Sequence, residues 1–275
     1  MCSPPQTALM RCVNDTKLLL VFSFIIAAVP AFGEVKMQVR DGLPIVEGVY
    51  VNGHGPYRFL LDTGTNVDLI ETKLARSIGL RATFQKELGS ASGATTVSGG
   101  DGFEVALDLA RADQQEFLFL GMEAIRDRWP DVQGVLGQEF LSRFDYLLDL
   151  RSKRLEFRKQ DCIGTRTRFT MTIGRPVIST SLGDLVLDSG AGRLVLFGVE
   201  PEMVGSDKSA LKTVAGSHAI GAVSSKPLVI EGRRIWPGET LALPRAPEPG
   251  VGGLLPVSLF KRIYVSNSEG YVVLE

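Results

Sequence analysis

The stretch Phe59–Ile70 reads FLLDTGTNVDLI: an apolar run, then Asp62-Thr63-Gly64, then a second apolar run. A close copy, LVLDSGAGRLVLF, occupies Leu185–Phe197, with Asp188-Ser189-Gly190 between its two apolar runs. The second aspartate follows the first by a little under half the length of the chain. Short apolar runs bounded by turn residues are typical of buried strands. We therefore expect two strand–loop–strand units whose loops face each other.

A carboxylate between two buried strands is costly unless it accepts hydrogen bonds. Thr63 and Ser189 place hydroxyl groups beside the two aspartates, and Gly64 and Gly190 let the backbone turn sharply with its N–H groups exposed. Two carboxylates held close together cannot both ionise, so they share a proton. The ionised one can take a proton from water while the neutral one donates to a substrate carbonyl. Such a pair hydrolyses an amide without a metal or a Ser or Cys nucleophile.

The Asp-Thr-Gly and Asp-Ser-Gly triplets resemble the paired catalytic motifs of the pepsin-like and retropepsin-like aspartic proteases. Gly134–Leu141 (GVLGQEFL) resembles the hydrophobic-hydrophobic-Gly element of that family, which threads beneath the catalytic loop and leads into a short helix. A glycine is needed there because two backbones approach closely. The resemblance covers nearly all of the chain after its N-terminal segment.

The resemblance implies an all-β fold of two pseudo-symmetric β-barrel lobes, with the active-site cleft between them. It implies an aspartic endopeptidase that acts on a peptide or protein substrate, needs no cofactor and no metal, and works as a monomer because one chain carries both motifs. Thr63 and Ser189 are expected to form a hydroxyl network that joins the loops. The implied site residues are catalytic Asp62 and Asp188, with Thr63, Gly64, Thr65, Ser189 and Gly190 supporting the loops.

The second half repeats the element order of the first, which favours an internal duplication. We place an N-terminal lobe at residues 34–159 and a C-terminal lobe at residues 160–275. Gly252–Phe260 (GGLLPVSLF) matches Gly134–Leu141, except that Pro256 stands where the family has glycine. Proline has no N–H and adds a ring where the strand passes close to the Asp188 loop. Either a local bulge accommodates it, or the second half is a relaxed copy that has lost catalytic geometry.

Residues 1–33 read as a signal peptide or an uncleaved signal anchor. Lys17 precedes an apolar run, Leu18–Ala31, of about 14 residues, which is the length of a secretory core and short for a membrane span. We therefore expect export to a periplasmic or extracellular location, with membrane anchoring through this segment as the alternative. Cys2 and Cys12 lie in the segment, so Cys162 would remain without a disulfide partner.

The composition narrows the classes of function. A net charge of −1 gives no indication of a nucleic-acid partner, and 44% hydrophobic residues suit a globular core. The 30 glycines and 14 prolines favour a β-rich chain with many turns. The sequence has no Cys-x-x-Cys, His-Glu-x-x-His or Gly-x-Ser-x-Gly motif, so metal-site and serine-hydrolase readings lack support. His54 and His218, the only histidines, lie beside no nucleophile motif.

Several local predictions concern the surroundings of the loops. Asn52-Gly53 predicts a hairpin turn whose returning strand ends at Asp62. Glu71–Leu80 reads as a short helix that stops at Gly79. Gly89–Gly100 is either a flap over the substrate or an ordinary surface loop, and it lacks the tyrosine of pepsin-like flaps. We expect solvated or turn carboxylates at four positions, Asp68, Asp101, Asp145 and Asp149.

Two other functions stay open beside the endopeptidase. One is a non-catalytic peptide-binding relative, which Pro256 would favour. The other is a phosphate binder related to sugar or acetate kinases, which also place Asp-x-Gly between strands. For the endopeptidase we expect an optimum at about pH 4–6, because Thr65 offers a hydroxyl to the first aspartate where Ala191 offers none to the second.

Overall fold

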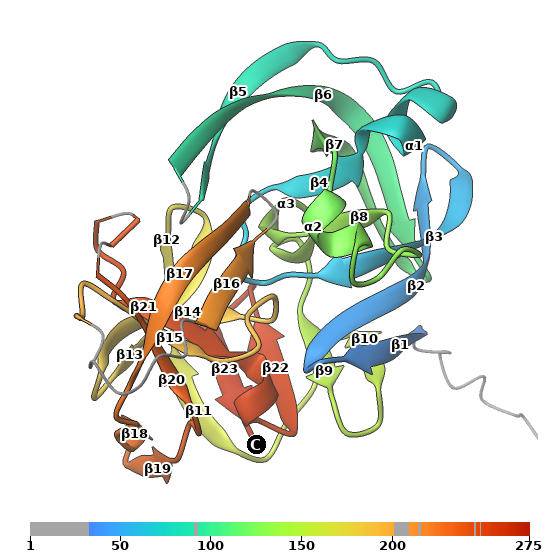
Figure 1. Ribbon diagram of the computed structural model, residues 1–275. Helices are drawn as coiled ribbons and strands as arrows, with labels where there is room; N and C mark the ends of the chain where they lie inside the picture. Colours follow the sequence, from blue (N-terminus) through green and yellow to red (C-terminus); the bar gives the residue numbers. More distant parts are fainter. Residues whose placement is uncertain (1–32, 91–92, 201–208, 214–215, 245, 248) are drawn as a thin grey trace, which may run out of the picture. The chain divides into compact units, whose positions relative to one another are not determined.

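The structure is a computed structural model that describes residues 33–90, 93–200, 209–213, 216–244, 246–247 and 249–275. The expected apolar segment at residues 18–31 lies outside this range. Most regular structure in the described part is β-strand, which confirms the all-β class, and the strands form two large sheets and one small one (Figure 1). A pair of pseudo-symmetric barrels stays a prediction. Within the described residues no helix is long and apolar enough to cross a membrane.

The largest sheet has 13 strands in the order β11-β23-β22-β9-β10-β1-β2-β3-β8-β4-β7-β6-β5. Their bounds are β1 (Glu34–Arg40), β2 (Leu43–Val51), β3 (His54–Leu61), β4 (Asp68–Glu71), β5 (Phe84–Ser90), β6 (Gly93–Leu107), β7 (Ala110–Leu120), β8 (Gly134–Leu136), β9 (Tyr146–Asp149), β10 (Arg154–Phe157), β11 (Thr165–Arg168), β22 (Arg262–Ser266) and β23 (Tyr271–Leu274).

The second sheet has eight strands in the order β12-β13-β14-β21-β15-β20-β17-β16, and β18 pairs with β19 separately. These strands are β12 (Thr170–Thr172), β13 (Arg175–Thr180), β14 (Gly183–Asp188), β15 (Leu194–Phe197), β16 (Ser209–Thr213), β17 (Gly216–Val223), β18 (Leu228–Ile230), β19 (Arg233–Ile235), β20 (Thr240–Leu243) and β21 (Gly253–Pro256). The helical elements are α1 (Thr72–Ser77), α2 (Glu123–Arg126), α3 (Gln138–Leu141) and the 3-10 turn η1 (Val257–Leu259).

The hairpin β2–β3 delivers the first aspartate. Asn52 and Gly53 both have positive φ, 49° and 75°, as a two-residue turn between twisted strands requires. The predicted Asn-Gly hairpin is thus confirmed, and β3 begins directly after the turn, at His54. The last three residues of β3 are buried, so the strand ends in the core with Asp62 next in the chain.

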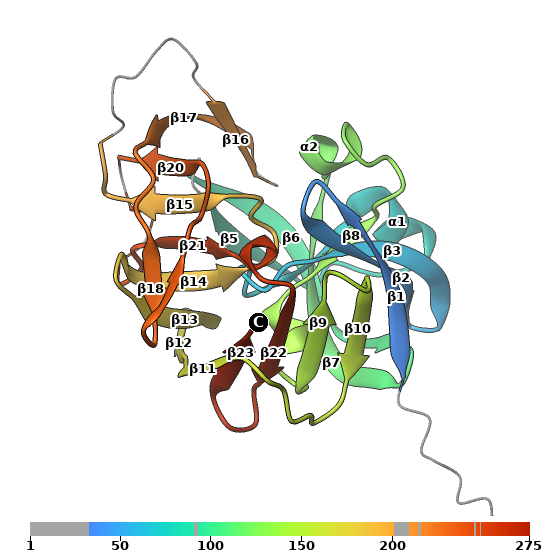
Figure 2. The same cartoon turned by 90° about the horizontal axis from the view of Figure 1, so that it is seen from below.

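Each Asp loop is framed by the same three-strand arrangement, which Figure 2 shows for the second half. In the first half β3 runs parallel to β8, with Leu61 opposite Leu136, and β4 runs antiparallel to the other edge of β8. In the second half β14 runs parallel to β21, with Leu187 opposite Leu255, and β15 runs antiparallel to β21. The two halves therefore bring their Asp loops out of equivalent strands.

Strands from both halves share the 13-stranded sheet. The hairpins β9–β10 and β22–β23 both form, and β9 pairs with β22 directly, with Asp149 opposite Arg262. Strand β11 then adds to the far edge of β23. The segment around residue 160, where we place the lobe boundary, connects β10 to β11.

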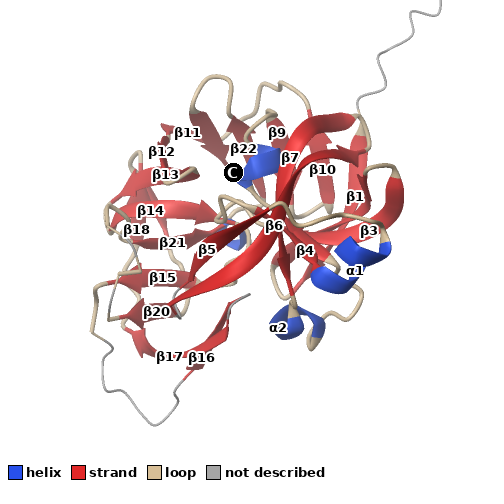
Figure 3. Ribbon diagram, turned by 90° about the horizontal axis from the view of Figure 1, so that it is seen from above, coloured by secondary structure: helices blue, strands red, loops and turns tan. Residues whose placement is uncertain are grey.

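The segment Gly89–Gly100 belongs to a long hairpin, β5–β6, in which Ser90 pairs with Gly93. The end of this hairpin points toward the strands of the second sheet (Figures 1 and 3). The side chains of residues 89–94 are not described. The segment Ala124–Asp131 contains most of the one-turn helix α2.

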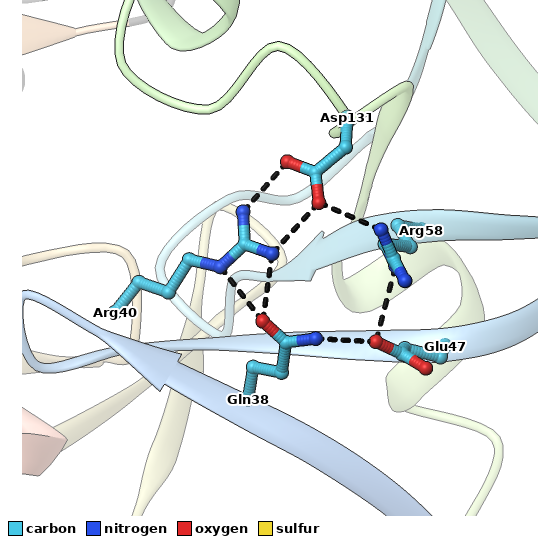
Figure 4. Close-up of polar contacts among 5 residues, drawn as sticks. All are labelled: Gln38, Arg40, Glu47, Arg58 and Asp131. Carbon is cyan, nitrogen blue, oxygen red and sulfur yellow. Dashed lines mark hydrogen bonds and ion pairs between the residues drawn. The ribbon is translucent and has the colours of Figure 1, made fainter.

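A charged network clamps β1, β2 and β3 to the loop before β8 (Figure 4). Arg40 binds both carboxylate oxygens of Asp131, at 2.6 and 2.7 Å, and Arg58 binds Asp131 at 2.8 Å and Glu47 at 3.0 Å. Gln38 donates to Glu47 and accepts from Arg40. The hydrogen bond from Arg40 is the main cause that lowers the pKa of Asp131 to about 2.

We predict that Asp131→Asn destabilises the protein by about 1 kcal/mol at neutral pH, since charge-assisted bonds to a half-exposed carboxylate are worth that much. The pKa of this group is lower in the folded chain than the ordinary 3.8, so its contribution is present above about pH 4 and is lost as the pH falls toward 2. Urea unfolding at pH 6 and pH 3 measures this. The exposed Asp113→Asn is the control, and an equal loss for both variants, or a loss independent of pH, contradicts the prediction.

Candidate functional site

The two Asp loops lie against each other through the residues that follow the aspartates. Thr63 and Ser189 are 1% and 0% exposed, respectively. The Thr63 hydroxyl donates to Leu187 O at 2.7 Å and accepts from Ser189 N at 3.0 Å. The Ser189 hydroxyl donates to Leu61 O at 2.6 Å and accepts from Thr63 N at 2.9 Å. Each hydroxyl thus bonds two backbone groups of the opposite loop, and the four bonds fix the loops as one unit.

The glycines of the two triplets leave space for the opposite carboxylates. A Cβ on Gly64 would lie 2.6 Å from either carboxylate oxygen of Asp188, and a Cβ on Gly190 would lie 2.5 Å from Asp62 Oδ2. No side chain fits at these distances. Glycine is therefore required at both positions by close approach, and each aspartate faces the backbone of the other loop.

Backbone N–H groups hold the two carboxylates unequally. Asp62 Oδ1 accepts from Gly64 N at 2.9 Å, whereas Asp188 Oδ1 accepts from Gly190 N at 2.7 Å and from Ala191 N at 2.9 Å. Asp188 is also the more deeply buried of the two, at 6% exposure.

Burial raises the pKa of both aspartates. The pKa of Asp188 rises further, well above its ordinary value, because the charge of Asp62 lies beside it. The pKa of Asp62 is drawn back by the N–H of Gly64, by a hydrogen bond with Asp188 and by the positive charge of Arg175. The pair therefore retains a proton at pH values where an isolated aspartate has lost it.

Arg175 comes from the first residue of β13, next to the turn at Gly174. A Cβ on Gly174 would lie 3.1 Å from Cβ of Asn66, so this turn packs on the Asp62 loop. Thr65, by contrast, makes no hydrogen bond with the Asp62 side chain among the described residues. Its methyl group faces Gly137, where a Cβ would come within 2.6 Å of Thr65 Cγ2.

Pro256 is buried in an extended conformation, with φ −70° and ψ 132°, and lies opposite Asp188 in the register of β14 and β21. Its equivalent in the first half is Gly137, whose N–H donates to Asp68 at 2.7 Å. By the same register the equivalent of Asp68 is Leu194, which is 0% exposed. The second half thus lacks both the N–H donor, where Pro256 replaces Gly137, and the carboxylate acceptor, where Leu194 replaces Asp68. Pro256 therefore leaves no such acceptor unsatisfied there.

Asp68, which we expected to be solvated or part of a turn, is fully buried. The prediction was wrong because Asp68 opens β4, which lies between β7 and β8, with α3 packed against it.

Gln138 is a second residue that sequence reasoning missed: its side chain donates to Thr63 O at 2.8 Å, and its backbone N donates to Thr65 O at 2.9 Å. A polar residue directly after the hydrophobic-hydrophobic-Gly element was the signal for it.

His54 does not join the pair. His54 is exposed at the start of β3, opposite Val51 and seven residues before Leu61, where the strand ends. The side chain of His218, on β17, lies outside what the structure describes. In the described part of the chain no group of three or more His, Cys, Asp or Glu side chains is arranged to hold a metal ion.

We predict that Thr63→Val lowers the free energy of unfolding by about 2–5 kcal/mol, because it leaves Ser189 N–H and Leu187 C=O buried without partners. Thr63→Ser keeps the hydroxyl and should lose only about 1 kcal/mol for the missing methyl group. Urea unfolding followed by circular dichroism compares the two. Equal stability of the Val and Ser variants would show that the hydroxyl bonds do not hold the loops.

Comparison with known proteins gives one family match and a structural likeness. Residues 48–140 match a family model described as aspartyl protease, which spans the first Asp loop and most of α3. A structural likeness was found to a retropepsin-like aspartic protease from Rickettsia conorii, with 19% identity, a TM-score of 0.34, and coverage of 46% of this chain and 89% of that chain. No curated protein matches the chain. The family match supports a protease-type function.

Proposed function

We propose that the protein is an aspartic endopeptidase that hydrolyses peptide bonds with a water molecule activated between Asp62 and Asp188. One observation carries the proposal: each aspartate is held by backbone N–H groups of its own loop while its carboxylate fills the space above the glycine of the other loop. Two carboxylates in mutual contact, with burial raising both pKa values, are the arrangement that shares one proton.

In the proposed reaction the two aspartates have different roles. Asp62, beside the positive charge of Arg175, is the ionised member and takes a proton from the attacking water. Asp188 keeps the shared proton, because its pKa rises further, and donates it to the carbonyl oxygen of the scissile bond. The tetrahedral intermediate then collapses as the proton on Asp62 passes to the leaving amine and a hydroxyl of the intermediate returns a proton to Asp188. The pair thus ends with the protonation state in which it began, and the water and the two carboxyls supply every proton that moves.

The surroundings support a peptide as substrate. The β5–β6 hairpin points toward the second sheet and is the best placed lid, which would exclude water from the reacting amide (Figure 3). The turn before β13 packs on the Asp62 loop at its other side and brings Arg175 toward the pair. The non-catalytic alternative drew its support from Pro256. The second half has Leu194 where the first half has Asp68, so the missing N–H of Pro256 leaves no such acceptor bare, and this removes the reason to favour that alternative.

The wider setting is part of the same proposal. One chain supplies both aspartates, so we propose a monomer whose lobes correspond to residues 34–159 and 160–275. The apolar run at residues 18–31 supports export, either with cleavage or with the segment as an anchor.

Cleavage of a mixed peptide pool from pH 3 to 8 tests the function. We expect a maximum at about pH 4–6, where one carboxyl of the pair is ionised and the other is not. Asp188→Asn and Asp62→Asn should each reduce the rate by about 10³-fold or more, whereas the exposed Asp113→Asn should not. Cleavage that continues to rise above pH 8, or equal cleavage by the wild type and Asp188→Asn, would exclude the proposed pair.

Asp188→Asn should also change the thermal stability of the protein in a pH-dependent way. The pKa of Asp188 is higher in the folded chain than the ordinary 3.8, so the folded state loses stability as the pH rises above about 4. Asp188→Asn removes this penalty. We therefore expect the inactive variant to unfold at a higher temperature than the wild type at pH 7, with the difference shrinking toward pH 4. Thermal unfolding at both pH values measures it, and a variant less stable at pH 7 would contradict the assignment.

A further inference from the structure

We propose that Asp68 is a positioning residue for the reaction: by accepting the N–H of Gly137 it holds the turn beneath the Asp62 loop and so sets the orientation of the Asp62 carboxylate. This inference rests on the proposed function. Asp68 is 0% exposed, and its Oδ1 lies 2.7 Å from Gly137 N. The buried carboxyl is out of reach of a bound molecule, so its influence must pass through its neighbours.

A short chain of contacts links Asp68 to the first aspartate. Gly137 precedes Gln138, whose two N–H donors bind the carbonyls of Thr63 and Thr65. These carbonyls belong to the two residues on either side of Gly64, the residue that binds Asp62. A Cβ on Gly137 would lie 2.6 Å from Thr65 Cγ2 and 2.9 Å from Thr65 O, so the turn and the loop are packed without free space. A shift of Gly137 therefore moves the loop.

The second half of the chain has an Asp loop without the equivalent of the Asp68–Gly137 hydrogen bond. Its equivalent positions hold Leu194, Pro256 and Val257, so the donor, the acceptor and the side-chain amide are all absent there. Asp188 accepts two backbone N–H groups from its own loop, whereas Asp62 accepts one from its own loop, that of Gly64. The orientation of Asp62 consequently depends more on the turn beneath its loop.

The environment of Asp68 disfavours the charged form of its carboxyl. Its second oxygen, Oδ2, is buried and has no hydrogen-bond partner among the described residues. The charged groups that face it are Glu139 on α3 and Arg143 just beyond, which form an ion pair at 3.6 Å with each other. Burial raises the pKa of Asp68 well above its ordinary value and Glu139 raises it further, while the Gly137 and Phe140 N–H groups and Arg143 lower it in part. The other titratable groups of the loops are Asp62 and Asp188.

Three variants test the role. Asp68→Asn keeps an acceptor for Gly137 and mimics the neutral acid, so it should retain kcat within about threefold. Asp68→Leu reproduces the residue of the second half but leaves the Gly137 N–H bare, and should lower kcat by about 10–100-fold with KM changed by less than about threefold. Leu155→Ala, a fully buried site on β10, is the control for lost stability alone and should leave kcat unchanged in the folded protein.

The pH dependence of the unfolding temperature tests the protonation state of Asp68. Because burial raises the pKa of Asp68 in the folded chain above its ordinary value of 3.8, its ionisation costs stability as the pH rises above about 4. Asp68→Asn should therefore raise the unfolding temperature at pH 7, with the gain vanishing toward pH 4. Loss of both stability and kcat in Asp68→Asn at pH 7 would mean an ionised carboxylate and would overturn the neutral form. A folded Asp68→Leu with the kcat of the wild type would overturn the positioning role.

Amide hydrogen exchange separates a failure of this inference from a failure of the proposed function. If the wild type cleaves no peptide, the endopeptidase proposal fails, but the structural link can still be measured. Asp68→Leu should speed the exchange of the Gly64 and Gln138 amides by tenfold or more relative to Leu155→Ala. Unchanged exchange at both amides would show that Asp68 does not hold the Asp62 loop.

Discussion

The reciprocal bonds between Thr63 and Ser189 are the constraint on which the rest of the structure depends. Each hydroxyl donates to one buried carbonyl and accepts from one buried N–H of the opposite loop, so neither loop satisfies its backbone without the other. Buried polar networks of this kind are favourable only when every member has a partner. The fold must therefore bring two loops from distant parts of the sequence together before either is stable.

The two halves of the chain support their Asp loops with equivalent strands but with different side chains beneath the loops. In the first half, polar contacts from Asp68 and Gln138 hold the loop; in the second, Leu194 and Pro256 fill the same positions with apolar groups. A duplicated frame thus tolerates divergence where donor and acceptor are lost together. Pro256 looked damaging in isolation because its missing N–H was judged without knowledge of what that N–H would have faced.

Much of this architecture was predictable from the sequence, because its signals are local. The Asn52-Gly53 turn, the apolar strands before each aspartate and the two hairpins β9–β10 and β22–β23 all follow from turn chemistry and strand pattern. What failed was the placement of Asp68. A carboxylate is mostly exposed on average, and nothing within a few residues shows that β7, β8 and α3 will surround it. The shared 13-stranded sheet was missed for a related reason: the pairing of β9 with β22 joins residues more than a hundred positions apart.

Three buried carboxyls near one site, Asp62, Asp68 and Asp188, are a cost to the fold that packing alone does not explain. Burial raises the pKa of each, so at neutral pH the folded chain either binds protons that the unfolded chain would release or carries charge in a poorly solvated place. Carboxyl groups whose pKa values are raised by burial are found at functional sites, where the groups are arranged for chemistry rather than for stability. Asp131 is the contrast: its arginine partners lower its pKa, and its charge stabilises the fold. The opposite signs separate a carboxylate whose charge stabilises the fold from three whose burial disfavours their charge.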